Sequence, residues 1–129
     1  MGARVGAVTL LVDEYDRAVA FYRDALGFDL VEDTDLGGGK RWVLVRPAGG
    51  GTALLLARAS DPAQAARVGD QTGGRVGFFL HTDDFAGDHA RMTAAGVEFL
   101  EAPRHESYGS VAVFRDLYGN RWDLLELRS

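Results

Sequence analysis

A carboxylate on a predicted strand is the first candidate for chemistry in this sequence. Side chains alternate along the stretch 121–127, so Asp123 shares one face with Leu125 and Leu127. An ionised carboxylate is rarely buried alone among apolar neighbours. Two interpretations stay open: a structural acid, or a group that binds a cationic ligand or acts as a base. A structural acid needs a paired arginine, for which the candidates are Arg41, Arg75 and Arg121.

Three histidines offer imidazole chemistry. His81 lies on the same predicted strand face as Phe79, and an ordinary pKa of about 6.5 suits a general base or a group that contacts a ligand. A hydrogen-bonded structural histidine is the alternative. His89 falls on a predicted helix face, which favours packing. His105 lies in a polar loop, which favours exposure to solvent over a functional role.

The absence of several residues and motifs excludes certain kinds of active site. The chain has no cysteine, so disulfides, thiolate metal sites and a cysteine nucleophile are excluded. The Gly-Gly-Gly-Lys stretch 37–40 lacks the spacing and the following helix of a phosphate-binding loop, and it predicts a hairpin connection. No Gly-x-Ser-x-Gly or zinc-protease motif occurs. Trp42, Phe79 and Tyr108 are aromatic candidates for a pocket wall, with the core as the alternative.

The elements that position these groups follow the same order in both halves of the chain. Each half is expected to begin with a strand and a helix that ends at a glycine, Gly27 in the first and Gly96 in the second. Asp13 is the expected cap of the first helix, and Asp83 or Asp84 of the second. The expected strands are 4–12, 28–34, 41–46, 52–57, 75–82, 97–100 and a hairpin over 108–127 that turns at Gly119, and the expected helices are 14–25 and a segment ending at about 95.

The two halves form an internal repeat of about 70 residues. The sequence Val-Asp-Glu-Tyr at 12–15 matches Thr-Asp-Asp-Phe at 82–85, and Gly50 matches Gly119. The fold class predicted is α+β, with two tandem β-α-β-β-β modules, mostly antiparallel sheets and helices outside. The modules are expected over 1–58 and 74–129, joined by a linker over 59–73.

Two stretches resemble the vicinal oxygen chelate superfamily, which includes glyoxalase I, bleomycin-resistance proteins, fosfomycin-resistance thiol transferases and extradiol dioxygenases. The hairpin 108–127 has the aromatic-Gly start, the Arg-Asp pair, the Gly-Asn turn and the Trp-acid-Leu strand of that family. The family's Asp-Pro-Asp-Gly-Asn turn is Asp-Leu-Tyr-Gly-Asn here. The string 21–28 is similar to the family's first-helix signature. The resemblance covers essentially the whole chain and implies cup-shaped sheets, often completed across a homodimer.

The resemblance also implies a metal site built from His or Glu at four strand positions. Matching through the repeat and the turn places these positions at Ala7, Leu54, Gly77 and Asp123. Only Asp123 can act as a ligand, and a divalent ion needs several converging N or O donors. We therefore expect no metal and no other cofactor, although a substitute divalent metal is not excluded by the sequence.

Alternation around the four family positions predicts where a ligand binds. The predicted pocket is lined by Thr9, Leu11, Leu54, Leu56, Phe79, His81, Asp123 and Leu125. Apolar residues at three of the family positions make an apolar, roomier floor, which suits a small organic molecule. We expect a binding protein of the bleomycin-resistance type. The alternatives are a superfamily enzyme (lyase, isomerase, thiol transferase or dioxygenase type) that uses Asp123 and His81, and a non-catalytic scaffold; the sequence identifies no ligand.

Composition bounds the partners and the location. A net charge of −5 argues against nucleic acid and anionic membranes as partners. The sequence contains no apolar run long enough to span a membrane and no signal peptide, and it has no cysteine. These features predict a cytoplasmic protein. The resemblance and the small size predict a homodimer.

Overall fold

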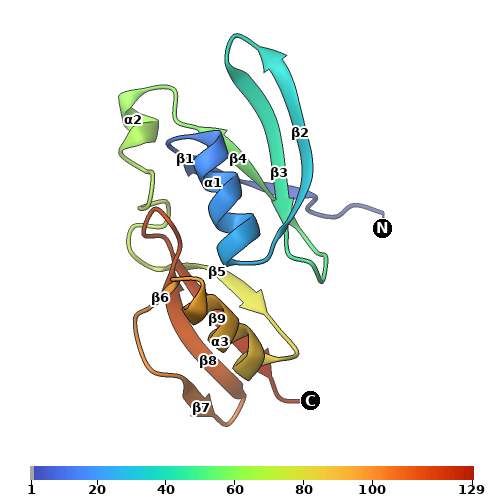
Figure 1. Ribbon diagram of the computed structural model, residues 1–129, viewed down its shortest axis with the longest axis vertical. Helices are drawn as coiled ribbons and strands as arrows, with labels where there is room; N and C mark the ends of the chain where they lie inside the picture. Colours follow the sequence, from blue (N-terminus) through green and yellow to red (C-terminus); the bar gives the residue numbers. More distant parts are fainter. Residues whose placement is uncertain (1) are drawn as a thin grey trace. The chain divides into compact units, whose positions relative to one another are not determined.

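A computed structural model describes residues 2–129 and confirms the predicted α+β fold (Figure 1). The chain divides into two compact units, of which the first ends at Val68 and the second begins at Gly69. We call them unit 1 and unit 2 and describe each by itself.

Unit 1 is one sheet with a helix against it. Its elements are β1 (Ala7–Val12), α1 (Tyr15–Ala20), the π-helical turn η1 (Phe21–Ala25), β2 (Asp29–Gly37), β3 (Lys40–Arg46), β4 (Ala53–Arg58) and the short helix α2 (Pro62–Ala65). The sheet order is β1-β4-β3-β2, with β1 and β4 parallel and the other neighbours antiparallel. The first and last strands of the β-α-β-β-β order pair in parallel. The helix α1 and the turn η1 connect β1 to β2 at the opposite edge of the sheet, and α1 packs on β3 and β4.

Unit 2 repeats this topology. Its elements are β5 (Val76–His81), α3 (Phe85–Ala94), β6 (Glu98–Phe99), β7 (Arg104–Glu106), β8 (Gly109–Arg115) and β9 (Arg121–Leu127). The sheet order is β5-β9-β8-β6, with β5 and β9 parallel, and β7 also pairs with β8. The strand predicted over 97–100 is shorter than expected, and the loop that follows it contains the extra strand β7. The chain between β6 and β7 leaves the sheet at residues 100–103 and rejoins it, which the sequence did not show.

Most buried strand residues of each sheet lie on the face that its helix covers, whereas Ala53 and Val111, at 5% and 2% exposure, lie on the opposite face. In unit 1 the side chains at 0% exposure on that face come from β1, β3 and β4, and α1 contributes Tyr15, Ala18 and Val19. The strand members are Leu10, Val12, Val43, Val45 and Leu56. In unit 2 the corresponding core is Phe85, Met92, Ala112, Phe114, Trp122 and Leu124. We call these the helix faces, and the opposite side of each sheet its open face.

The two helices begin and end for local reasons. The cap of α1 is Glu14, whose Oε1 accepts from the Asp16 N–H at 3.3 Å. The predicted cap, Asp13, is wrong by one residue, because the Asp13 carboxylate instead accepts from Arg17 Nη1 at 2.7 Å. At the other end Gly27 has a φ of 74°, as predicted, and Phe28 N donates to the Tyr22 carbonyl at 2.8 Å.

In unit 2 the predicted helix signals are confirmed. Asp84 is the cap of α3 and accepts from the Gly87 N–H at 3.1 Å. Gly96 follows the helix with a φ of 92°. A further hydrogen bond joins the start of α3 to the sheet: Glu126 Oε1 on β9 accepts from the Phe85 N–H at 2.7 Å.

The turn between β8 and β9 is organised around one buried carboxylate. Oδ1 of Asp116 accepts from the backbone N–H groups of Tyr118, Gly119 and Asn120 at 3.0, 3.1 and 2.9 Å. Oδ2 accepts from Asn120 Nδ2 at 3.0 Å and from Trp122 Nε1 at 3.4 Å. Gly119 has a φ of 101°, as the predicted turn requires. This network fixes the start of β9 and therefore the register of Asp123.

The segment predicted as a linker contains α2, capped by Asp61, whose Oδ1 accepts from Gln64 N at 2.8 Å. It then turns at Gly69, where φ is 81° and a Cβ atom would overlap the carbonyl oxygen of Tyr118. Glycine is therefore required there. Of the helices within residues 2–129, none has the length and apolar character needed to span a membrane.

Candidate functional site

The open face of unit 2 brings together four of the predicted site residues. In the parallel pairing of β5 with β9, Phe79 lies opposite Asp123 and His81 lies opposite Leu125. Their neighbours Trp122 and Leu124 are buried on the helix face, so alternation places the four on the open face. Phe79 is 57% exposed, which leaves an aromatic ring available beside the carboxylate.

Asp123 is a half-buried carboxylate without a donor. Its side chain makes no hydrogen bond and no ion pair with any residue in 2–129. Burial raises the pKa of Asp123, while the Arg104 guanidinium opposes that shift and the Glu101 carboxylate adds to it. The carboxylate therefore lies in an environment that penalises its charge and supplies no hydrogen bond in return.

Glu101 and Arg104 form the charged pair that acts on the pKa of Asp123, and sequence analysis missed both. Arg104 Nε donates to Glu101 Oε1 at 2.9 Å, and this bond lowers the pKa of Glu101. The other oxygen, Oε2, accepts from the Val113 N–H at 3.0 Å, where the chain between β6 and β7 leaves the sheet. The three-residue spacing of the pair was the available signal, but nothing in the sequence connected that loop with Asp123.

Two of the predicted site residues lie on the wrong face. The parallel pairing sets Val8 opposite Leu54 and Leu10 opposite Leu56, while Thr9 pairs with Leu55. Leu54 and Leu56 are 5% and 0% exposed, so both belong to the helix face. The prediction that they share a face with Thr9 and Leu11 is therefore wrong, and the open-face residues of β4 are Leu55 and Ala57.

The wrong face was predicted for Leu54 and Leu56 because the turn before β4 is one residue longer than the matching turn in unit 2. Residues 47–52 connect β3 to β4, whereas residues 116–120 connect β8 to β9. Leu44 pairs with Leu55 as Val113 pairs with Asp123, so the repeat partner of Asp123 is Leu55 and not Leu54. The strand sequence Ala-Leu-Leu-Leu-Ala-Arg is apolar on both faces, so alternation could not reveal the shift.

The residues present do not fit the metal site of the resembled family. On the corrected register the two positions in unit 1 are Ala7 and Leu55, which offer no side-chain donor, and unit 2 offers Gly77 and Asp123. Nowhere in the described chain do three or more His, Cys, Asp or Glu side chains gather in a group that could hold an ion. We derive no chemistry through a metal.

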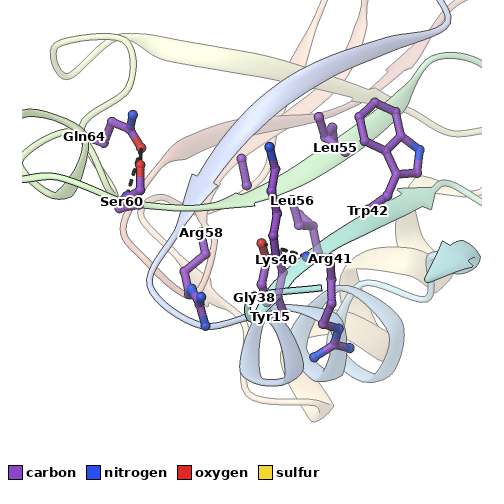
Figure 2. Close-up of a pocket in the computed structure, with 12 residues that line it drawn as sticks. Tyr15, Gly38, Lys40, Arg41, Trp42, Leu55, Leu56, Arg58, Ser60 and Gln64 are labelled. Carbon is purple, nitrogen blue, oxygen red and sulfur yellow. Dashed lines mark hydrogen bonds between the residues drawn. The ribbon is translucent and has the colours of Figure 1, made fainter. Parts of the chain in front are cut away.

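Unit 1 has a pocket of about 720 Å³ at the β4 end of its sheet (Figure 2). In Figure 2, Trp42 and Leu55 lie at one side of the pocket, Ser60 and Gln64 at the other, and Lys40 extends between them. The complete lining is Tyr15, Gly38, Lys40, Arg41, Trp42, Leu55, Leu56, Ala57, Arg58, Ala59, Ser60 and Gln64. Trp42 was predicted as a possible wall residue and Leu56 as a site residue. Leu55 and Ala57 were missed because of the register shift in β4, and the remaining lining residues come from separate elements and loops that alternation does not connect.

The remaining candidates lie apart from these groups. His105 Nδ1 is 2.9 Å from Ser110 Oγ on the neighbouring strand, and Tyr108 is 48% exposed. His89 packs against Phe99, with ring centroids 4.1 Å apart, and its buried Nε2 has no hydrogen-bond partner among the described residues. The packing role expected for His89 is what the structure shows.

Comparisons with known proteins agree with this architecture. The sequence model of the Glyoxalase/Bleomycin resistance protein/Dioxygenase superfamily matches residues 4–124. An uncharacterized protein from Shewanella frigidimarina is 53% identical over 122 residues, which cover 93% of this chain and 90% of that protein. The crystal structure of UcmS2 superposes with a TM-score of 0.83 at 31% sequence identity, and the match covers 97% of this chain and 98% of UcmS2. The crystal structure of TnmS3, an antibiotic binding protein from Streptomyces sp. CB03234, is 31% identical with a TM-score of 0.79 and covers 99% of both chains.

Proposed function

Because this chain belongs to the Glyoxalase/Bleomycin resistance protein/Dioxygenase superfamily, we propose that it binds a small organic molecule on the open face of unit 2, with Asp123 as the polar anchor. TnmS3 is described as an antibiotic binding protein, and its similarity extends over the whole chain. That similarity supports binding of a small molecule rather than of a macromolecule.

The observation that carries the proposal is the unpaired carboxylate of Asp123. A protein stabilises a buried carboxylate with donors, and here the donors are absent from residues 2–129. Burial raises the pKa of Asp123, so an arriving cation or N–H donor would gain a partner whose charge is poorly solvated. The site therefore favours a ligand that carries a positive charge or a hydrogen-bond donor.

The neighbours of Asp123 supply the rest of a binding surface. Phe79 offers an exposed ring directly across the strand pair, and Leu125 continues the apolar surface. His81 lies two positions along β5 on the same face and can donate or accept a hydrogen bond. An aromatic face beside an anion suits an aromatic cation.

We also propose that the metal of other superfamily members is not used here, because Ala7, Leu55 and Gly77 provide no side-chain ligands. Homodimer formation and a cytoplasmic location are part of the same proposal. They stay predictions that rest on the resemblance and on composition.

The proposal is tested with a matched pair of ligands. Naphthalen-2-ylmethylammonium and the neutral naphthalen-2-ylmethanol have the same ring and differ in the charge of one group. Isothermal titration should show tighter binding of the cation, and Asp123→Asn should weaken it by about 1–3 kcal/mol, the usual scale for stranding a buried partner. The neutral alcohol should be much less affected.

Asp29→Asn is the control, because Asp29 is exposed on β2 in unit 1 and the substitution makes the same change in net charge. It should leave the affinity for the cation unchanged. Equal binding of the cation by the Asp123→Asn variant and the unmodified protein, or equal binding of cation and alcohol, would contradict the proposal.

A further inference from the structure

All the charged residues that line the pocket of unit 1 are cations. Among its lining residues Lys40, Arg41 and Arg58 are charged, and no aspartate or glutamate is among them. The whole chain has a net charge of −5. The pocket is therefore a positively charged concave surface on an acidic protein, and binding of an anion would explain it.

One of these cations is already neutralised. Arg41 Nη2 is 2.6 Å from Asp33 Oδ2 and Arg41 Nη1 is 2.8 Å from Asp16 Oδ1. The two carboxylates raise the pKa of Arg41 above its usual range. This guanidinium has a structural role, since it joins α1 to the hairpin of β2 and β3.

The other two cations have no carboxylate partner in the described part of the chain. Arg58 Nη2 donates to the Gly39 carbonyl at 3.0 Å, and its guanidinium carbon lies 5.2 Å from the centre of the Tyr15 ring. These contacts hold the guanidinium in place and leave several of its five N–H donors free. Lys40 is the single lysine of the chain and makes no contact with an acid in residues 2–129.

An apolar wall completes the pocket. Trp42 is 39% exposed, and Figure 2 shows its indole at the side of the pocket that Leu55 also lines. Its volume of about 720 Å³ is enough for an organic molecule of two or more rings. An exposed indole offers a flat face on which a planar ring stacks.

We propose that the pocket of unit 1 binds a small planar organic anion, a ring system that carries a carboxylate. The ring packs against Trp42 and Leu55, the carboxylate pairs with Lys40, and Arg58 is the second cation. This site goes beyond the one around Asp123, because it is built entirely from unit 1 residues and selects the opposite charge.

The two tryptophans provide a direct test, because one lies in each unit. In ¹H–¹⁵N spectra, 2-naphthoate should shift the indole N–H signal of Trp42 and leave that of Trp122 in place, since Trp122 is buried in unit 2. The Trp42→Phe variant assigns the two signals. The neutral 2-naphthamide should give little shift at the same concentration.

Lys40→Gln should weaken 2-naphthoate binding about tenfold, because it removes a charge-assisted hydrogen bond. Lys40 is exposed and makes no contact that the fold requires, so this variant keeps the structure intact. Arg58→Gln should weaken binding to a similar extent. Arg46→Gln is the control, because it removes a cation from β3 that does not line the pocket. Asp123→Asn should leave 2-naphthoate affinity unchanged, which separates this inference from the proposed function.

Three results would overturn the inference. The first is equal affinity of the Lys40→Gln variant and the unmodified protein for 2-naphthoate. The second is an equal shift of the Trp42 signal by 2-naphthamide. The third is an equal shift by inorganic phosphate at the same concentration and ionic strength, because it would show a site for a bare anion that does not recognise the ring.

Discussion

Units 1 and 2 have the same strand order but close their last hairpins in different ways. The turn 47–52 in unit 1 has no buried residue, whereas the turn 116–120 in unit 2 buries Asp116 and Asn120 at 5% exposure each. The first turn is also one residue longer. A repeated fold therefore tolerates a change in turn length as long as the paired strands keep the same face toward the helix.

The two units differ further in the chemistry that they present. Within the described residues, unit 2 has a carboxylate without a donor on its open face, and two of the pocket cations of unit 1 have no carboxylate partner. The helix faces remain apolar in both units. Packing constrains the helix face in each repeat, while the other side chains are free to diverge, so a duplicated topology does not predict a duplicated site.

The largest expected difference between the units is in the stability of their turns. Asp116→Ala should lower the free energy of unfolding by about 3 kcal/mol, because it leaves several buried N–H donors of the turn and Trp122 Nε1 without an acceptor. The matching position in the repeat is Pro47. Pro47→Ala should cost about 0.5 kcal/mol, as usual for a surface position. Urea denaturation of both variants measures the difference, and equal costs would remove the distinction between the turns.

A smaller effect is expected where the helices differ. His89 on α3 matches Val19 on α1 in the repeat, and Val19 is 6% exposed. His89→Leu should raise the stability by about 1 kcal/mol, because it removes a buried nitrogen that no group in residues 2–129 hydrogen-bonds. The reciprocal change, Val19→His, should lower stability by more than that amount. A loss of stability in the His89→Leu variant would show that the imidazole has a role that its packing against Phe99 does not explain.

The smallest effect concerns pH and the open face of unit 2. Burial raises the pKa of Asp123 in the folded state, so the folded protein holds that proton more strongly than the unfolded chain does. Stability associated with Asp123 is therefore present at low pH and is lost as pH rises through the raised pKa. Asp123→Asn does not ionise and should gain stability relative to the unmodified protein between about pH 3 and pH 7.

We expect this gain to stay below about 1 kcal/mol, because the carboxylate is partly in contact with water. Unfolding midpoints across this pH range measure it. Asp29→Asn in unit 1 should show no comparable pH trend, since Asp29 is exposed and makes no hydrogen bond or ion pair in the described chain. A relative loss of stability on raising the pH would mean that Asp123 is stabilised as a carboxylate.

Apart from the cap of α1, which is Glu14 and not Asp13, features that depend on a few neighbouring residues were predicted correctly. Gly27, Gly96 and Gly119 have positive φ values, and each follows a helix or forms a turn as expected. Alternation placed Trp122 and Leu124 on one face of β9, and both are buried. The repeat predicted the order of the elements, because equal hydrophobic patterns require equal secondary structure.

The register of the strands in unit 1 could not be predicted in this way. Leu54, Leu55 and Leu56 are equally apolar, so only the hydrogen-bonded pairing with Thr9 and Leu44 shows which of them lies on the open face. The sequence also did not predict which charged residues lie near Asp123. The charges that act on Asp123 are those of Arg104 and Glu101 and not of the three proposed arginines, and Arg104 begins β7, directly after the segment that leaves the sheet.

By itself, the sequence determined the family, the two-module topology and the positions where the backbone must turn. These follow from local propensity and from patterns that repeat along the chain. Only the tertiary structure decided that Asp123 meets no donor among residues 2–129, that Leu54 is core, and that Lys40 and Arg58 face one pocket with Trp42. Such properties depend on which distant segments meet in each sheet, and a one-residue difference in a turn changes them without changing the fold.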